Sequence, residues 1–296
     1  MRCPGSCGEF LQGWLDGSEK LISYAIDCFS QMNLEPQPST DGNAAFQREH
    51  PRAMAMALHT LTRAGLPREA LEEVTLKLSS SLPRSKGMAS STADLAVTGA
   101  AVAAWAGIRL TPQELTELCT DMEPTDSTLH TQLVLMDPLT GRVTRRYNPL
   151  PELGVLVLEG LAAVDTATFR RADHNKNRKA LHRELEEALE LFEKGLNTGN
   201  HQCLADACLI SARANQYFYP HPGLEGLHQT VCRYGAWGLN IAHSGSSIGI
   251  LHDPRRFQLE GFLEEWHRAP AAIHYFPPRF HRIIPGGVQP VPHTGP

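Results

Sequence analysis

A loop rich in small residues and hydroxyls, residues 83–94, carries side chains suited to phosphate chemistry. It reads PRSKGMASSTAD and joins a predicted strand to an alanine-rich helix. Small residues let the backbone approach an anion, and the free N–H groups and dipole of a helix start attract it. Lys86 adds a cation for phosphate oxygens, and a hydroxyl can ligate Mg²⁺. The alternative is a plain N-cap formed by the hydroxyl run at residues 90–92; no GxxxxGK[ST] P-loop occurs.

Two carboxylates follow the end of a predicted helix. Pro124 breaks the helix, so Glu123 and Asp126 lie on an irregular segment that can turn both acids to one side. Phosphoryl transfer to an alcohol needs a metal for the triphosphate, donors for the moving charge and an acceptor for the hydroxyl proton. We assign Asp126 as the base and Glu123 as the metal ligand, although the two roles can be exchanged. The alternative is a pair of solvated acids.

Two further turns of small residues flank these motifs in the sequence. Near the N-terminus, residues 4–14 read PGSCGEFLQGW, and Glu9 could hold an α-ammonium group. Asp27, on the next strand, is a second candidate for that role, and Asp165 is a candidate for the acceptor pocket. Near the C-terminus, residues 238–250 form a Gly-Ser turn between two apolar strands. Taken alone, these segments could be a plain turn and a plain hairpin.

The remaining pattern predicts a mixed chain with more strand in the first half and more helix in the second. The predicted strands cover residues 11–15, 20–23, 25–34, 74–82, 131–136, 142–147, 154–158, an edge strand at 271–276, and a strand–turn–strand at 239–252. The predicted helices cover residues 51–65, 90–105, 111–122, 176–196, 201–218, 224–234 and 255–267. Residues 35–50 are expected to form a loop, and a boundary between two halves is expected near residues 149–152.

Composition and charge limit the classes of binding partner that we expect. The formal net charge is −5 and no long basic cluster occurs, so nucleic acid is not expected as a partner. Neither a signal peptide nor an apolar run of bilayer length is visible, so we expect a cytoplasmic protein that does not bind a membrane. The seven cysteines contain no CxxC pair, and most should be reduced and structural.

Together, these motifs resemble the three sequence motifs of the GHMP kinases, the superfamily of galactokinase, homoserine kinase and mevalonate kinase. Gly87, Ser90 and Ser91 match the central phosphate loop, whereas Ser85 and Ala89 stand where the family has glycines. The resemblance implies a two-lobed α+β fold. An N-terminal nucleotide-binding βα domain would cover residues 1–152, and a ferredoxin-like α+β domain residues 153–285. Independently of the resemblance, residues 286–296 are rich in Pro and Gly and are expected to form a disordered tail.

The resemblance also implies the ligands and the residues that hold them. ATP and Mg²⁺ are the expected cofactors, and the nucleotide would be bound by Pro83, Lys86, Gly87, Met88, Ala89, Ser90, Ser91 and Thr92. Ser91 would also ligate Mg²⁺ with Glu123, and Asp126, Lys86 and Ser91 would be catalytic. The acceptor would be bound by Ser6, Cys7, Gly8, Glu9, His243, Ser244, Gly245 and Ser246, with Asp27 and Asp165 as further candidates.

The details of the first two motifs are similar to those of L-threonine kinases, so the expected acceptor is the hydroxyl of L-threonine. Two alternatives remain. One is another alcohol, such as homoserine or an isoprenoid precursor, although Glu9 and Gln12 favour a substrate with an amine. The other is a nucleotide-binding sensor without turnover, which the absence of glycine at positions 85 and 89 favours. A homodimer is expected as one possible assembly.

Overall fold

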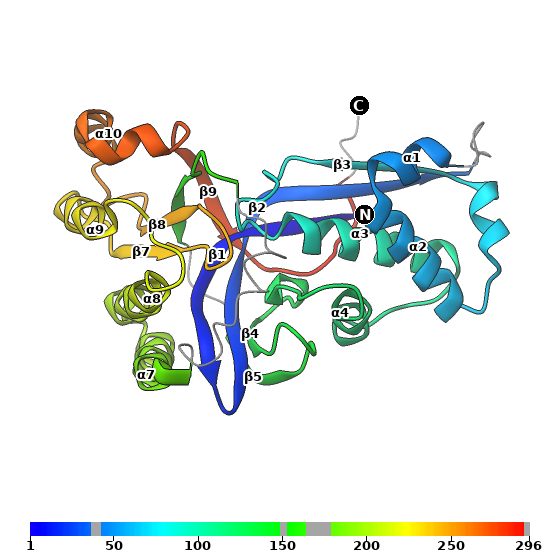
Figure 1. Cartoon of the computed structure of the whole chain (residues 1–296), viewed down its shortest axis with the longest axis horizontal. Coiled ribbons are helices and arrows are strands. Elements are labelled where there is room, and N and C mark those ends of the chain that lie inside the picture. The colour runs from blue at the N-terminus through cyan, green and yellow to red at the C-terminus, as the bar shows by residue number, and fades with distance from the viewer. Residues whose placement is uncertain (37–42, 149–152, 164–178, 293–296) are drawn as a thin grey trace.

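In the computed structural model of the chain, a long β-hairpin runs through the middle of the molecule. The structure describes residues 1–36, 43–148, 153–163 and 179–292. The hairpin pairs β1 (Arg2–Leu15) with β2 (Ser18–Glu35), and its turn lies at the predicted position. On one side of it lie helices α2 (Pro51–Arg63), α3 (Ser90–Trp105) and α4 (Pro112–Thr120) (Figure 1). On the other side lie helices α7 (His182–Thr198), α8 (His201–Asn215), α9 (Leu224–Arg233) and α10 (Leu259–Arg268). The hairpin therefore connects two groups of helices and contributes residues to the space between them.

In the described part of the chain, nine strands form one antiparallel sheet in which β2 also pairs with β3, outside the main path β1-β7-β8-β6-β9-β2-β4-β5. The remaining strands are β3 (Thr75–Ser80), β4 (Leu133–Met136), β5 (Val143–Tyr147), β6 (Gly154–Leu158), β7 (Gly238–Ile241), β8 (Ile248–His252) and β9 (Arg279–Ile284). Because β1 pairs with both β2 and β7, the path closes into a circuit of six strands. Residues 4–14, expected to form a turn, are instead an irregular, bulged part of β1, and this circuit brings them against the C-terminal turn of small residues.

The helices follow the predicted pattern closely, with small shifts at their ends. They are α1 (Ala44–Glu49), α2 (Pro51–Arg63), α3 (Ser90–Trp105), α4 (Pro112–Thr120), α7 (His182–Thr198), α8 (His201–Asn215), α9 (Leu224–Arg233) and α10 (Leu259–Arg268), with short 3₁₀ segments at Arg68–Glu73, Ser127–Leu129 and Pro270–His274. Helix α3 has its predicted bounds, and α4 begins with the capping box in which Thr111 and Glu114 hydrogen-bond reciprocally.

Four features differ from the expectations. Helix α1 lies within the expected loop 35–50, and its Phe46 is buried, so a local apolar contact supports a turn of helix there. The expected edge strand at 271–276 is largely the 3₁₀ segment Pro270–His274, and the unpredicted strand β9 lies inside the sheet, where it pairs with both β6 and β2. In the expected disordered tail, Gln289 pairs with Arg2 through backbone and side-chain hydrogen bonds, so the described residues 286–292 are held against β1.

Two apolar clusters support this arrangement. The larger joins the hairpin to α2, α3, α7 and α8, with Phe10, Tyr24 and Phe192 fully buried between them. The smaller lies between β6–β8 and α9 and α10. All seven cysteines are free, and six of them are buried, in agreement with a structural role. Within the described ranges, no helix has both the length and the apolar character needed to cross a bilayer.

Candidate functional site

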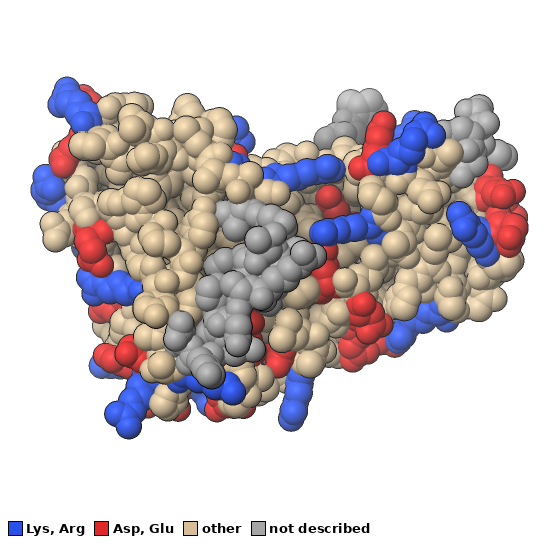
Figure 2. Space-filling model, in the orientation of Figure 1, with Lys and Arg blue, Asp and Glu red and all other residues tan. Residues whose placement is uncertain are grey.

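A cleft of about 600 Å³ lies between the hairpin, the start of α2 and the start of α3. Basic and acidic side chains lie next to each other along the hollowed middle of the molecule (Figure 2). From the sequence-predicted site, the cleft is lined by Glu9, Gly87, Met88, Ala89, Ser90, Ser91, Thr92, Glu123, Asp126 and Ser244. All four predicted segments thus contribute to this cleft. The phosphate loop and the first turn of α3 provide six of these residues, the acidic segment provides Glu123 and Asp126, strand β1 provides Glu9, and the C-terminal turn provides Ser244.

The start of α3 opens into this cleft. Its N-cap residue, Ala89, makes no side-chain capping hydrogen bond, and the next three residues line the cleft. The first amides of a helix have no partner within the helix, so here they are available to an anion. This geometry agrees with the phosphate interpretation and not with a side-chain N-cap.

The loop before α3 keeps a glycine-like backbone without the family's glycines. Ser85 has φ 60° and Ala89 has φ 55°, both in the left-handed region that glycine adopts at lower cost. Ser85 and Ala89 therefore adopt a backbone conformation that is typical of glycine, at a steric cost of about 1–2 kcal/mol per residue. The absence of glycine at positions 85 and 89 thus does not prevent a left-handed backbone there.

Backbone contacts join the three motifs around the loop. The N–H of Ser6 donates to the Met88 carbonyl over 3.1 Å, and the N–H of Ser247 donates to the Lys86 carbonyl over 3.3 Å. Gly87 has φ +75°, and a Cβ there would lie 2.5 Å from the Ala242 Cβ, so the C-terminal turn packs directly on the phosphate loop. Strand β1 and the C-terminal turn therefore both contact the loop through its backbone.

Ser91 and Glu123 lie on either side of one cation. The guanidinium of Arg52, in the first turn of α2, donates to a Glu123 carboxylate oxygen over 2.8 Å and reaches Ser91 Oγ at 3.5 Å. The Arg52 side chain is 68% exposed, so it can leave this position easily. A hydroxyl and a carboxylate that share a cation are suitable oxygen ligands for Mg²⁺, which commonly binds one or two carboxylates together with substrate phosphates. The pair therefore fits a magnesium ion at the start of α3.

Asp126 lies beside the same helix start. Its carboxylate accepts a hydrogen bond from Ser23 Oγ at 3.0 Å, and Thr92 Oγ1 lies 3.5 Å from its other oxygen. The backbone N–H of Asp126 also donates to Thr92 Oγ1 over 3.3 Å. These contacts connect Asp126 to the hairpin and to the first turn of α3, so its carboxylate is held at the edge of the cleft where a substrate hydroxyl could meet it.

Glu9 is buried at the base of the cleft and is held by the C-terminal turn. One of its carboxylate oxygens accepts two hydrogen bonds of 3.0 Å, from the backbone N–H and from Nδ1 of His243. The Nε2 atom of His243 lies 2.9 Å from Ser211 Oγ on α8. This chain of contacts fixes Glu9 from behind and leaves its carboxylate as part of the cleft wall. His243 thus contacts Glu9 and is not itself among the residues that line the cleft.

Lys86 differs from its expected role. Its side chain is buried, and Nζ donates to the backbone carbonyls of Gly160, Leu161 and Ala162 at 2.7, 2.9 and 3.1 Å. Lys86 does not line the cleft, whereas its neighbours in the loop do. The ammonium group thus fastens the phosphate loop to the segment after β6, and it is directed to these carbonyls and not into the cleft, where the sequence had placed it.

Several other predicted residues lie outside the cleft. Asp27 accepts hydrogen bonds from His281 and Arg282 on β9, which outweigh the opposing effect of burial and hold the pKa of Asp27 below its ordinary value. Burial raises the pKa of the Cys7 thiol to about 12, so it stays protonated inside the core. The residues that line the cleft also do not include Pro83, Ser6, Gly8, Gly245 and Ser246, and Ser246 Oγ donates to the Ala162 carbonyl. Asp165 lies outside the described residues.

The sequence interpretation missed several cleft residues. Arg52 and Arg84 both line the cleft, and Arg84 Nη2 lies 3.5 Å from His50 Nδ1. Neither role had a clear signal in the sequence, because Arg52 lies at what is predicted as an ordinary helix start and Arg84 lies in a loop. Asp94, one turn into α3, also lines the cleft; burial raises its pKa, and a hydrogen bond from Ser30 opposes that effect.

Comparisons with known proteins agree with this geometry. Residues 52–131 match the family model of the GHMP kinase N-terminal domain. The chain is 33% identical over 288 residues to an L-threonine kinase of Salmonella typhimurium, which covers 97% of this chain and 94% of the relative. It is 32% identical to an L-threonine kinase of Citrobacter freundii, over 97% of this chain and 98% of the relative.

The fold is also shared with solved structures. A phosphomevalonate kinase of Streptococcus pneumoniae, solved with phosphomevalonate and AMPPNP, has a TM-score of 0.70 over 96% of this chain and 99% of that chain, at 13% identity. At this identity the likeness concerns the fold alone. Over nearly its whole length, however, the chain is related to the two curated kinases, and it belongs to the GHMP kinase family.

Proposed function

We propose that this chain is an ATP-dependent L-threonine kinase that transfers a phosphoryl group to the side-chain hydroxyl of L-threonine. The observation that carries the proposal is the arrangement of the cleft. The uncapped start of α3 faces the same space as Asp126 and Glu9, so anion-binding amides, a proton acceptor and a carboxylate for the acceptor's amine lie together. The relatives named L-threonine kinase support the choice of acceptor.

The nucleotide would enter with its terminal phosphates at the start of α3. The amides from residues 90–92 and the helix dipole would bind the phosphate oxygens. Ser91 Oγ and a Glu123 oxygen would hold Mg²⁺, which neutralises charge on the triphosphate when bound. Arg52, released from Glu123 by that exchange, remains next to the phosphates as a mobile cation.

The acceptor would lie between Glu9 and Asp126. Glu9 would bind the α-ammonium group, because its carboxylate can only accept hydrogen bonds from such a donor. Asp126 would accept the proton of the threonine hydroxyl while the hydroxyl oxygen forms a bond to the γ-phosphorus. The bond between that phosphorus and the β,γ-bridging oxygen breaks at the same time, and ADP leaves with the electron pair. Asp126 then releases its proton to solvent.

The finer features of the fold and assembly stay proposals of the same kind. We infer two lobes, residues 1–152 and 153–285, the second with ferredoxin-like topology. The smaller apolar cluster, which lies entirely in the second lobe, supports this division. The boundary at residues 149–152 lies outside the described residues. The homodimer and the cytoplasmic location stay predictions from the sequence.

A substrate panel tests the proposed activity. Purified protein is incubated with ATP and Mg²⁺, and ADP release is followed in a coupled assay with L-threonine, L-serine, L-homoserine, mevalonate or galactose. We expect the highest kcat/KM with L-threonine. A higher kcat/KM with homoserine or mevalonate would assign the same fold to another alcohol, and nucleotide binding without ADP release on any of these acceptors would identify a sensor.

A further inference from the structure

A buried pair of polar side chains on the hairpin, Gln12 and Glu19, is not explained by the proposed catalytic roles. The Nε2 of Gln12 donates to a Glu19 carboxylate oxygen over 2.6 Å. Gln12 is 8% exposed and Glu19 is 5% exposed, so both are removed from solvent. Such a short, buried and charge-assisted hydrogen bond fixes the position of the amide.

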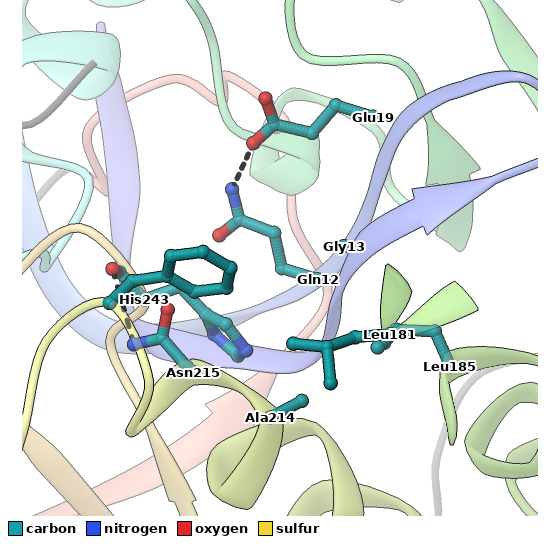
Figure 3. A pocket seen from close by; sticks show the side chains of 9 residues that line it. Gln12, Gly13, Glu19, Leu181, Leu185, Ala214, Asn215 and His243 are labelled. Carbon is teal, nitrogen blue, oxygen red and sulfur yellow. Dashed lines mark hydrogen bonds between the residues drawn. The ribbon is translucent and has the colours of Figure 1, made fainter. Parts of the chain in front are cut away.

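This hydrogen bond also determines which way the amide faces. A carboxylate can only accept hydrogen bonds, so the NH₂ group of Gln12 must face Glu19 and its carbonyl oxygen must face away. That oxygen, Oε1, is buried and has no hydrogen-bond partner among the described residues. Figure 3 shows the amide with Nε2 directed to Glu19 and the oxygen turned away from it. A buried acceptor without a partner is costly, so among the described residues this oxygen is left for a donor such as a bound ligand.

A β-bulge places this oxygen on the face of the hairpin that carries Glu9. Between Glu9 and Leu11, β1 advances two residues while β2 advances only one, from Ser23 to Ile22. In a regular strand, residues three apart point to opposite faces, and one extra residue reverses that alternation. Glu9 and Gln12 accordingly both line the cleft. The bulge thus places two acceptor side chains on the wall of the same cleft.

We propose that Gln12 Oε1 and the Glu9 carboxylate together bind the α-ammonium of the acceptor, and that Glu19 is the positioning residue for Gln12. The inference rests on the proposed function, because it concerns the same acceptor site. An ammonium group has three donors and no acceptor, so it matches two oxygens held rigidly in place. The arrangement selects amino alcohols and disfavours hydroxy acids of the same shape that have no amine.

A small cavity of about 20 Å³ beside Gln12 provides the competing explanation. Its walls include Leu185, Ala214 and Phe218, and it has room for about one water molecule. If a trapped water alone satisfied Gln12 Oε1, the amide would matter for stability and not for acceptor affinity. The two explanations therefore predict different effects of the same substitution.

Calorimetric binding of L-threonine and of 3-hydroxybutyrate, which lacks the amine, separates them. In Gln12→Leu we expect the Kd for L-threonine to rise at least ~10-fold, as for a lost hydrogen bond to a charged group. The weak binding of 3-hydroxybutyrate and the KM for ATP should change less than ~2-fold, because neither involves this amide. The matched control is Gln202→Leu, which removes an exposed glutamine that donates to Asp206 on α8, away from the cleft.

An exchange of the two side chains tests orientation independently of folding. In Glu19→Gln the new amide can accept or donate, so Gln12 can turn its NH₂ toward the ammonium, and the Kd should rise. In the double variant Gln12→Glu/Glu19→Gln, an oxygen again faces the cleft while the exchanged amide donates behind it, so affinity should recover to within ~3-fold of the wild type, because the acceptor pair is restored.

The outcomes distinguish this inference from the proposed activity. An unchanged Kd for L-threonine in Gln12→Leu, or a double variant that binds as weakly as Glu19→Gln, would overturn the role of Gln12. Wild-type protein that binds L-threonine with this pattern but does not phosphorylate it would overturn the proposed activity and leave the ammonium site in place. Wild-type protein that binds L-threonine no better than 3-hydroxybutyrate would overturn the inference directly.

Discussion

Substituting Asp126 with asparagine tests the proposed chemical step with little change in structure. Ser23 donates to one carboxylate oxygen, and the corresponding amide oxygen of the variant can accept the same hydrogen bond. The other oxygen faces Thr92 Oγ1, which can accept a hydrogen bond from the new amide N–H. The substitution therefore keeps the local contacts and removes only the negative charge and the capacity to accept a proton.

The size of the effect follows from these contacts. A positioned general base typically increases the rate of the chemical step by ~10²- to ~10⁴-fold. Asp126→Asn should therefore raise the activation free energy by roughly 3–5 kcal/mol. Because the hydrogen-bonding partners are retained, the free energy of unfolding should change by less than about 1 kcal/mol. The KM for ATP should change less than ~3-fold, because the amides of α3 that bind the phosphates are unaltered.

The assay is steady-state ADP release with L-threonine, together with thermal unfolding of the same preparation. The matched control is Asp121→Asn, an exposed acid just before the same segment that lies outside the cleft lining, for which kcat should stay within ~2-fold because surface substitutions rarely act at a distance. Wild-type kcat in a folded Asp126→Asn variant would refute the assignment of Asp126 as the base. A loss of kcat matched by an equal loss of stability would reduce Asp126 to a structural residue.

Four further predictions concern the metal, the loop and the pH dependence. Glu123→Gln should raise the Mg²⁺ concentration for half-maximal rate at least ~10-fold, measured by Mg²⁺ titration of turnover, and an unchanged titration would exclude Glu123 as a ligand. Lys86→Met should lower the free energy of unfolding by about 2–4 kcal/mol even without nucleotide, since three carbonyls lose a charged donor; denaturant unfolding that changes only in the presence of ATP would contradict this. Ala89→Gly should stabilise the chain by about 0.5–1 kcal/mol in the same assay, because it relieves a left-handed alanine, and a destabilisation would contradict the loop geometry. Burial lowers the pKa of His130 to about 4 from 6.5, so the unfolded chain binds a proton more readily and the free energy of unfolding should fall as pH drops from 6.5 toward 4. His130→Gln should reduce this loss by roughly 1–3 kcal/mol in denaturant unfolding at several pH values, and an unaltered loss would disprove the contribution.

Local sequence signals predicted much of the fold. Helix α3 has its predicted bounds because a run of hydroxyls followed by alanines both begins the helix and allows tight packing. The turn of the β1–β2 hairpin is marked by Asp16 and Gly17, which have positive φ values. Elements that depend on distant partners were not predictable in this way. Strand β9 has no buried residue and half of its residues are polar, and its strand structure comes with its pairing to β6 and β2.

The candidate site shows the same division between local and distant information. The chemistry of Glu9 could be predicted from its glycine-rich turn, but its contact with His243 spans 234 residues and depends on the closed strand circuit. Ser211 had no signal of its own, because it lies in a helix that reads as ordinary core. A lysine in a phosphate-loop motif suggests a phosphate contact, and only the fold placed the carbonyls of residues 160–162 around Lys86.

Identification of the product by ³¹P NMR is the most direct test of the account. Purified protein, ATP, Mg²⁺ and L-threonine should give one new phosphomonoester signal that grows in equal amount with ADP and coincides with added O-phospho-L-threonine. If ADP forms only together with inorganic phosphate, or if the new phosphomonoester appears only with an acceptor that has no amine, the acceptor site built around Glu9 and Asp126 is wrong.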